Sequence, residues 1–304
     1  MGTALVVGFG SIGKRHVSIL RKMGISVKIF SRRKIPDEQN FPTLEKAINE
    51  IHPEYLVIAN ETSEHFPTLK IALANEIPKI LIEKPIFSCL ENYKNLGNCN
   101  IRVAYNLRFH PLLEKIRTEI SNQSILSVQV YVGQYLPNWR LQKEYYKSYS
   151  VSKKLGGGVL RDLSHELDYL NWIFGPWQSL TAIGGHFSSL KGDSDDLFNI
   201  IFKMKRCPAI SLQMNYFDRR GRREIILNTD QNTFFIDLVS QTFCKDNTPP
   251  FEVSVDRDQT YIAQHKDMIE NQGESCCSVS EATEILRMIH MVEESNLQQK
   301  WISI

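Results

Sequence analysis

The sequence predicts an α/β chain of two domains: a parallel sheet covered by helices, then an α+β domain with a large, mostly antiparallel sheet. Three observations carry this prediction. The chain has 304 residues, enough for two domains with separate cores. Buried-strand patterns alternate with helix patterns up to about residue 105. Beyond that point strand patterns follow one another with few helices. We expect the first domain to span residues 1–118 and the second 119–304.

The first domain begins with an apolar strand pattern and then alternates strand with helix. Short apolar strands joined by helices are typical of a parallel sheet whose two faces are both covered. We expect strands at Ala4–Val7, Ser26–Phe30, Tyr55–Ala59, Lys79–Glu83 and Ile101–Tyr105, and helices at Ile12–Met23, Thr43–Ile51 and His65–Asn75.

The second domain is expected to be richer in strands. Helices are expected near Leu112–Ile120, Leu163–Phe174 and Glu281–Asn296, and strands at Leu126–Val132, Leu180–Phe187, Leu197–Met204, Ala209–Tyr216, Glu224–Asn228 and Thr233–Leu238. Turn residues at Arg220-Gly221 and Asp230-Gln231-Asn232 predict successive hairpins. The four arginines that surround Gly221 are expected to form a solvated turn, with an anion patch as the alternative.

Composition and charge exclude several classes of partner. The formal net charge of +2 is too small to predict binding to nucleic acid or to an anionic membrane. No stretch resembles a signal peptide or a membrane helix. The six cysteines form no CxxC pair and no Cys/His array with zinc spacing. We therefore expect reduced thiols, no metal site and a cytoplasmic protein.

A glycine motif follows the first expected strand and opens the first expected helix. Gly8-Phe9-Gly10-Ser11-Ile12-Gly13 fits GxGxxG. In that setting the first glycine allows a tight turn, the second lets the backbone approach a pyrophosphate, and the third lets helix and strand pack closely. The motif predicts a Rossmann domain that binds a dinucleotide, the alternative being a glycine-rich turn without a ligand.

The end of the second expected strand indicates which dinucleotide is bound. An acidic residue at this place usually contacts the ribose 2′-hydroxyl of NAD. Here Ser31, Arg32 and Arg33 stand there, and no acid follows before Asp37. Arginine binds phosphate through paired donors, so these residues favour NADP(H) over NAD(H), unless they form only a solvated basic loop.

Several further segments together resemble one enzyme family. They are Glu83-Lys84-Pro85 at a strand end, Val57-Ile58-Ala59-Asn60 followed by His65, Asn106-Leu107-Arg108-Phe109-His110-Pro111, and Gly156-Gly157-Gly158-Val159-Leu160-Arg161-Asp162-Leu163-Ser164-His165. With the glycine motif they resemble the glucose–fructose oxidoreductase / inositol dehydrogenase / MocA family. The resemblance implies cofactor contacts from Asn60, Glu61, His65, Glu83, Lys84 and Asn106, and a substrate contact from Arg108.

The resemblance also implies the catalytic residues. Lys84 and His165 are assigned to proton transfer, which of the two is the base being left open, and Asp162 is assigned to positioning. The ordinary alternatives are a surface lysine, a packing histidine and a helix cap. Many family members separate the Asp and the His by four residues, whereas Asp162 and His165 are three apart. On one helix either spacing places both side chains on the same face.

An aromatic loop precedes the triple glycine. Tyr135, Trp139, Arg140 and Tyr149 are expected to bind substrate, because aromatic faces stack on rings and arginine grips phosphate or carboxylate. The alternative is a loop that packs on its own domain. The triple glycine is expected to allow close approach of the backbone to a ligand, or else to form a plain turn.

These features predict an enzyme that transfers a hydride between NADP(H) and a CH–OH carbon of a sugar or nucleotide sugar. The segment Leu163-Ser164-His165-Glu166-Leu167-Asp168 resembles family members associated with bacterial surface-sugar synthesis. Two alternatives stay open: a polyol, cyclitol or imino acid dehydrogenase, and a sensor or regulator that binds the cofactor without turnover. Helices are expected on only one face of the second sheet, so we expect a homodimer or a dimer of dimers.

Overall fold

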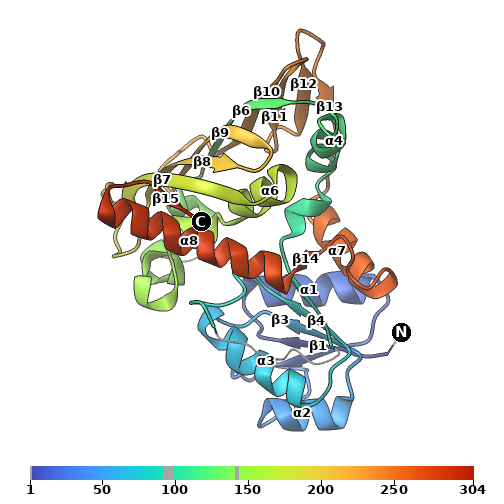
Figure 1. Ribbon diagram of the computed structural model, residues 1–304. Helices are drawn as coiled ribbons and strands as arrows, with labels where there is room; N and C mark the ends of the chain where they lie inside the picture. The colour runs from blue at the N-terminus through green and yellow to red at the C-terminus, as the bar shows by residue number, and fades with distance from the viewer. Residues whose placement is uncertain (1, 92–98, 141–143) are drawn as a thin grey trace. The chain divides into compact units, whose positions relative to one another are not determined.

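The computed structural model describes residues 2–91, 99–140 and 144–304, which form two compact units (Figure 1). Unit 1 comprises Met1–Phe109 and Asp256–Leu286, and unit 2 comprises His110–Val255 and Arg287–Ile304. This division differs from the expected boundary at 118/119 in two ways. The helix that begins at Pro111 lies in unit 2, and residues 256–286 return to unit 1.

A six-stranded sheet forms the centre of unit 1. Its strands are β1 (Ala4–Val7), β2 (Val27–Phe30), β3 (Tyr55–Ile58), β4 (Lys79–Ile82), β5 (Asn100–Val103) and β14 (Cys277–Ser278). The order is β14-β5-β4-β3-β1-β2, and all neighbours are parallel except β14 and β5. Every residue of β1 and β3 is buried, because helices cover both faces of the sheet. The predicted parallel sheet is confirmed.

The predicted helices of unit 1 form within one or two residues of their expected bounds. They are α1 (Ser11–Lys22), α2 (Leu44–Ile51) and α3 (His65–Ala74), with short 3₁₀ turns η1 (Thr62–Glu64) and η2 (Asn106–Phe109). In Figure 1, α1 lies on one face of the sheet and α2 and α3 lie on the other. The Thr43 hydroxyl accepts the Lys46 N–H at 3.2 Å and so caps the start of α2.

Helix α7 (Gln259–Glu270) has no counterpart in the sequence prediction. Its buried residues are Thr260, Gln264, His265, Asp267 and Met268. Four of these five are polar, so the helix lacks the apolar stripe by which a sequence pattern reveals an amphipathic helix. It packs against α1 and η2, which makes residues far along the chain part of unit 1.

Unit 2 is built on a nine-stranded sheet. Its strands are β6 (Ile125–Gly133), β7 (Trp177–Gly185), β8 (Leu197–Met204), β9 (Cys207–Asn215), β10 (Arg222–Thr229), β11 (Thr233–Asp237), β12 (Thr242–Lys245), β13 (Phe251–Glu252) and β15 (Ile302–Ser303). The order is β13-β12-β11-β10-β6-β9-β8-β7-β15. Only β6 and β9 are parallel neighbours, so the prediction of a mostly antiparallel sheet is confirmed.

One of the two predicted hairpins is wrong. The turn at Asp230-Gln231-Asn232 joins β10 and β11, which are antiparallel neighbours as expected. The turn at Arg220-Gly221 joins β9 to β10, but β6 lies between these strands and pairs with both. Turn residues show where the chain reverses. They do not show that the two strands on either side are hydrogen-bonded to each other.

The helices of unit 2 pack on one face of this sheet. They are α4 (Pro111–Glu119), α5 (Val159–Asp162), α6 (His165–Phe174) and the part of α8 (Val279–Gln298) that begins at Arg287; the turns η3 (Leu136–Arg140), η4 (Tyr145–Lys147), η5 (Tyr149–Val151) and η6 (Lys153–Leu155) join β6 to α5. Helix α4 belongs to this unit because Lys115 lies 5.0 Å from the Phe243 ring and Glu119 pairs with Lys245 at 3.3 Å.

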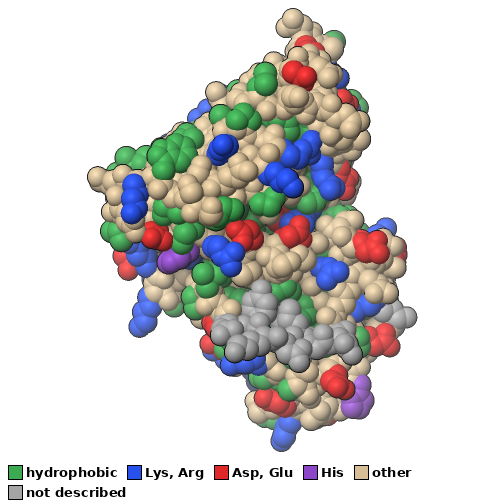
Figure 2. Space-filling model, viewed as in Figure 1, with side chains coloured by type: hydrophobic (Ala, Val, Ile, Leu, Met, Phe, Trp, Pro, Cys, Tyr) green, Lys and Arg blue, Asp and Glu red, His purple; other side chains and the backbone are tan. Residues whose placement is uncertain are grey.

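The surface agrees with the small net charge. Figure 2 shows basic and acidic side chains interspersed over the visible face. All six cysteines are free thiols. Within the described ranges, no helix is both long and apolar enough to cross a membrane.

Candidate functional site

The glycine motif forms a tight loop at the carboxyl end of β1. Gly8 has a φ of +98°, which other residues rarely adopt. A Cβ atom on Gly13 would lie 2.1 Å from the Gly8 carbonyl oxygen, so only glycine fits where α1 meets the loop. A Cβ on Gly10 would meet nothing within 4 Å. The backbone at Gly10 is therefore open to a ligand.

The start of α1 suits a phosphate group. The first-turn amides of a helix point toward its N-terminal end and carry partial positive charge. The α1 helix has no acidic residue in its first turn, and the Gly10 cap brings no side chain of its own. The exposed Gly10 and Ser11 lie at this end, and the exposed Lys14 lies one turn on. This arrangement fits the pyrophosphate of a dinucleotide.

The basic residues after β2 lie at the surface. Arg32 and Arg33 are exposed, and the Ser31 hydroxyl accepts the Arg33 N–H at 3.1 Å. Arg32 pairs with Glu61 at 2.6 Å, with exposed side-chain fractions of 66% and 63%. An ion pair this exposed holds its partners weakly, so the guanidinium can be drawn to another anion.

Asn60 and His65 take different places at the end of β3. The Asn60 side-chain NH₂ donates to the Thr68 hydroxyl at 2.8 Å, while its Oδ1 is buried and accepts no hydrogen bond from the described residues. That oxygen can accept from a bound group. His65 is 1% exposed, and burial holds its pKa below 6.5. Its Nδ1 lies 3.1 Å from the carbonyl oxygens of Pro85 and Ile86, a placement that favours support of the loop after β4.

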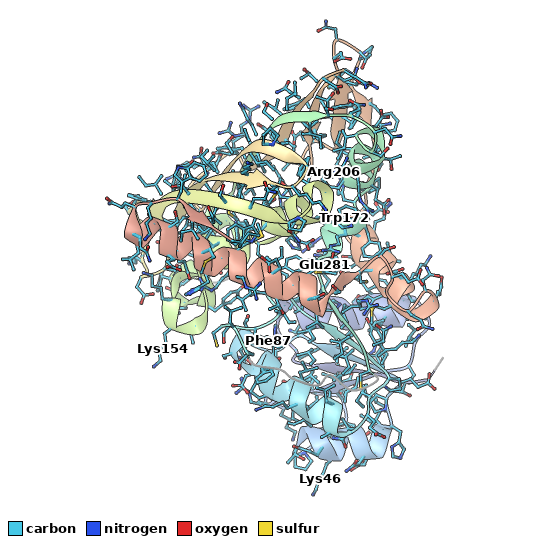
Figure 3. All side chains as sticks on the ribbon, in the orientation of Figure 1. Lys46, Phe87, Lys154, Trp172, Arg206 and Glu281 are labelled. Atoms are coloured by element: carbon cyan, nitrogen blue, oxygen red, sulfur yellow. The ribbon has the colours of Figure 1, made fainter. Side chains whose placement is uncertain are left out.

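The Glu83-Lys84-Pro85 segment directly follows β4. Glu83 is 8% exposed, and its Oε2 accepts the Lys84 N–H at 3.1 Å. Its Oε1 lies 2.8 Å from Nε2 of His16, a residue of α1. The Lys84–Pro85 peptide is cis. Phe87, labelled in Figure 3, continues the segment into the core and packs edge-on against Phe66 at 5.1 Å.

Asn106 and Arg108 lie in η2 and are almost fully buried. The Asn106 side-chain NH₂ donates to the Thr260 hydroxyl of α7 at 2.6 Å. Arg108 is 3% exposed and pairs with Glu281 at 2.9 Å. Glu281 belongs to the first turns of α8 (Figure 3). This pairing favours a structural role for Arg108, which is not carried into the proposed substrate site.

In unit 2, Asp162 is held by a tyrosine that the sequence did not reveal. Asp162 ends α5 and is 8% exposed. The Tyr216 hydroxyl donates to its Oδ2 at 2.7 Å. Burial, followed by the charge of Asp162, raises the pKa of Tyr216 well above its ordinary value, so the hydroxyl stays protonated and donates. The Trp139 ring stands edge-on against Tyr216 at 5.4 Å. The aromatic loop and Asp162 are thus neighbours.

The expectation that Asp162 and His165 share one helix is wrong. Helix α5 ends at Asp162, and α6 begins at His165. Leu163 and Ser164 form a turn between the two helices, so their spacing does not follow helical periodicity. Glu166, the next residue of α6, is fully buried and pairs with Arg223 through both carboxylate oxygens, at 2.7 and 3.2 Å.

The triple glycine serves close packing within unit 2. A Cβ on Gly157 would lie 2.2 Å from the Tyr149 carbonyl oxygen. Gly158 has a φ of +119°, and a Cβ there would lie 2.4 Å from Asp195. The Asp195 carboxylate accepts the Leu160 N–H at 3.3 Å, which caps α5 from outside the helix. Burial raises the pKa of Asp195. Only Gly156 faces open space.

The remaining substrate candidates lie around Trp139. The Arg219 guanidinium stacks on the Tyr135 ring at 4.1 Å, and Tyr149 is 40% exposed. Arg140 ends η3, but its side chain lies outside the described residues. The arginines around Gly221 had been expected to form a solvated turn, but three of them contact other side chains. Arg219 stacks on Tyr135, Arg222 pairs with Asp218 at 2.9 Å, and Arg223 pairs with buried Glu166.

Comparisons with known proteins agree with this architecture, a unit with a mainly parallel sheet and a unit with a large, mostly antiparallel sheet. Residues 122–235 match the GFO/IDH/MocA C-terminal domain. An uncharacterized oxidoreductase of Synechocystis sp. is 28% identical over 152 residues, which are 47% of this chain and 40% of that protein. The match therefore spans less than half the length of this relative.

Two solved structures share the fold over nearly the whole chain. Levoglucosan dehydrogenase in complex with NADH and L-sorbose has a TM-score of 0.85 at 15% identity, covering 100% of this chain and 99% of that one. UDP-N-acetylglucosamine 3-dehydrogenase of Acidithiobacillus ferrooxidans has a TM-score of 0.81 at 16% identity, covering 98% and 99%. The match of residues 122–235 to a domain of the Gfo/Idh/MocA oxidoreductases agrees with the predicted resemblance to that family.

Proposed function

We propose that this protein is an NADP(H)-dependent oxidoreductase that transfers a hydride between the nicotinamide and a carbinol carbon of a sugar or nucleotide sugar. The observation that carries the proposal is the open backbone at Gly10, at the start of a helix whose first turn holds no acid, on the sheet that also presents Glu83-Lys84. Both features follow parallel strands, and ligands of such sheets lie at the carboxyl ends of the strands.

The chain's residues fit the cofactor in three places. The loop of Gly8, Gly10 and Gly13 would hold the pyrophosphate against the α1 amides. Ser31, Arg32 and Arg33 would hold the adenosine end. The buried Oδ1 of Asn60 would accept a hydrogen bond near the nicotinamide. When bound, the nicotinamide supplies the hydride donor or acceptor.

The proposed proton chemistry belongs to Lys84 and His165. Oxidation of a carbinol requires a base for the hydroxyl proton, and the reverse reaction requires an acid at the same place. We assign this exchange to the Lys84 Nζ and the His165 imidazole. Asp162 acts as a positioning residue, since its Oδ2 is fixed by the Tyr216 hydroxyl at 2.7 Å.

Sugars suit the groups that unit 2 presents around Asp162. Trp139, Tyr135 and the half-exposed Tyr149 offer aromatic faces, and apolar sugar faces stack on such rings. The Trp139 indole N–H is buried and donates to none of the described residues, so it can donate to a ligand oxygen. The solved structures of similar fold include one bound to L-sorbose and one named for a nucleotide sugar. We propose a role in surface-glycan synthesis.

NADP(H) preference is proposed from the end of β2. Two exposed guanidiniums and a hydroxyl stand there without an acid among them, and a 2′-phosphate would form charge-assisted hydrogen bonds with them. Arg32 is held by Glu61 only through an exposed pair. Levoglucosan dehydrogenase was solved with NADH, so cofactor choice must be tested on this chain.

We also propose that two copies pair through the outer face of the unit 2 sheet. One row of that face runs from Thr181 through Ile201, Ser211, Gln129 and Ile226 to Phe235. Ile201 and Ile226 are 42% and 37% exposed, and Ile183 beside them is 64% exposed. Apolar side chains spread across a broad sheet face favour burial against a second copy.

The experiment is a panel of nucleotide sugars and free sugars, followed by nicotinamide absorbance with NADP(H) and NAD(H). Polyols, cyclitols and imino acids form the second arm. Turnover of a sugar with NADP(H) as the better cofactor supports the proposal. Turnover only in the second arm would mean that the substrate is a polyol, cyclitol or imino acid and not a sugar. Tight cofactor binding without turnover of any substrate would favour a sensor.

A further inference from the structure

Four buried side chains of unit 1 form one hydrogen-bonded chain that ends at the Glu83-Lys84 segment. The Tyr55 hydroxyl lies 2.9 Å from Nδ1 of His265, and Nε2 of His265 lies 2.9 Å from Nδ1 of His16. Nε2 of His16 lies 2.8 Å from Oε1 of Glu83. Tyr55, His265 and His16 are all 0% exposed. The chain joins β3, α7, α1 and the end of β4.

The chemistry of the four groups gives this row of hydrogen bonds one direction from donor to acceptor. An ionised carboxylate only accepts hydrogen bonds, so His16 donates from Nε2. In a neutral His16, Nδ1 then accepts, so His265 donates from its Nε2. Nδ1 of His265 must therefore accept from the Tyr55 O–H. Burial, followed by the neighbouring His16, holds the pKa of His265 well below its ordinary value, and burial raises that of Tyr55. Both shifts keep these groups neutral, as the direction requires.

We propose that Tyr55, His265 and His16 are a positioning relay that fixes the Glu83 carboxylate and, through it, the backbone at Lys84. The two carboxylate oxygens of Glu83 have different hydrogen-bond partners. Oε1 is held by His16, and Oε2 accepts the Lys84 N–H at 3.1 Å. The orientation of the carboxylate therefore determines where the backbone N–H of Lys84 is held. This inference rests on the proposed function, in which the Lys84 side chain exchanges a proton with the substrate.

The surroundings of His16 support positioning rather than passage of protons. The Tyr261 ring lies 5.8 Å from His16 edge-on, and the Arg15 guanidinium covers that ring at 4.0 Å. Arg15 in turn pairs with Asp258 at 2.8 Å. The far end of the chain, Tyr55, is fully buried in β3. Because the Tyr55 end is enclosed in the core, the row is suited to hold a carboxylate still and offers protons no exit to water at that end.

The test compares two substitutions that differ only in hydrogen bonding. His16→Gln keeps a donor for Glu83 and an acceptor for His265, whereas His16→Met fills similar space with neither. We expect His16→Met to lower kcat by about 10²-fold with little change in the Kd of NADP(H), because small misplacements of a reacting group have effects of that size. His16→Gln should restore most of that loss. His290→Met, at an exposed position of α8, is the matched control and should leave kcat unchanged.

A second measurement does not depend on turnover. In ¹⁵N-labelled full-length protein, long-range ¹⁵N–¹H spectra should show His16 and His265 both protonated at Nε2. Tyr55→Phe should shift the ring ¹⁵N signals of His265 more than those of His16. In His16→Met the Lys84 amide should exchange faster with solvent than in His16→Gln. Protonation of His16 at Nδ1, or equal kcat in His16→Met and the unmutated protein, would overturn the relay. If no sugar turns over, the proposed function fails. The histidine tautomers and the exchange rate of the Lys84 amide then still test the relay.

Discussion

Replacing Arg32 with Ala should weaken NADP(H) binding far more than NAD(H) binding. Arg32 follows β2, and its guanidinium pairs with Glu61 at 2.6 Å, at a site where both side chains are about two-thirds exposed. A pair of this kind stabilises by no more than about 1 kcal/mol. Hydrogen bonds from a guanidinium to a phosphate are worth about 1.5–3 kcal/mol. The 2′-phosphate should therefore displace Glu61 as the partner of Arg32.

These magnitudes set the size of the effect. After up to about 1 kcal/mol is subtracted for breaking the Arg32–Glu61 pair, the loss is about 0.5–3 kcal/mol, which corresponds to a Kd for NADP(H) raised by roughly 2- to 150-fold. Glu61→Gln should act in the opposite direction, because it releases Arg32 and removes a negative charge near the phosphate. A gain of up to about 1 kcal/mol lowers the Kd of NADP(H) by about fivefold at most. Neither change should alter the Kd of NAD(H) much, since NAD(H) has no 2′-phosphate.

Titration calorimetry with both cofactors measures these constants, at one fixed ionic strength because salt screens exposed charges. Arg21→Ala is the matched control. Arg21 also belongs to unit 1 and also forms an exposed pair, with Glu38 at 2.6 Å, but it lies at the far end of α1 from the glycine loop. Equal losses for NADP(H) and NAD(H) in Arg32→Ala, or a loss no larger than in Arg21→Ala, would refute the reasoning.

Four further changes test other parts of the structure. Lys84→Ala should leave NADP(H) binding intact and lower turnover by about 10²–10⁴-fold in steady-state assays; near-normal turnover would remove Lys84 from the chemistry. Tyr216→Phe removes the donor to Asp162 but keeps the ring against Trp139, so kcat should fall by about tenfold or more with cofactor Kd unchanged. Burial, then Arg223, lowers the pKa of His110 from 6.5 to about 4, so the unfolded chain takes up a proton first and stability is lost as pH falls through that window. His110→Asn keeps an acceptor for the Leu112 N–H and cannot titrate, so urea unfolding should show a smaller loss of stability between those pH values. Ile201→Glu should convert the expected dimer to a monomer by light scattering, and a monomeric unmutated protein would contradict the proposed assembly.

The first sheet was predictable because its strands are buried on both faces. Ala4–Val7 and Tyr55–Ile58 are apolar throughout, and a run of this kind between helices has few other interpretations. Helix α7 was not predictable, since its buried face carries Thr260, Gln264, His265 and Asp267. The strands β13, β14 and β15 have two residues each. Strands this short depend on the partner they meet and leave no pattern of their own.

The candidate site likewise has residues that the sequence predicted and residues that it did not. The glycine loop, Lys84 and Asp162 lie in local motifs, and motifs can be read from the sequence. Tyr216 lies 54 residues from Asp162, and His265 lies 249 residues from His16. Nothing next to Tyr216 or His265 in the sequence indicates these partners. The break between α5 and α6 was also hidden, because hydrophobic periodicity continues across it from Leu160 to Leu167.

Helix α7 explains why unit 1 needs a segment that comes after most of unit 2 in the sequence. The family resemblance assigns cofactor contacts to both Glu83 and Asn106. Asn106 donates to Thr260 of α7, and Glu83 is tied to His265 of α7 through His16. Without α7, a buried amide and a buried histidine would each lose a partner, and unpartnered buried polar groups cost about 1–3 kcal/mol each. The polar face of α7 therefore does what an apolar face could not: it orients two side chains of the proposed site while closing the core around them. That requirement accounts for a helix whose sequence carries no apolar stripe.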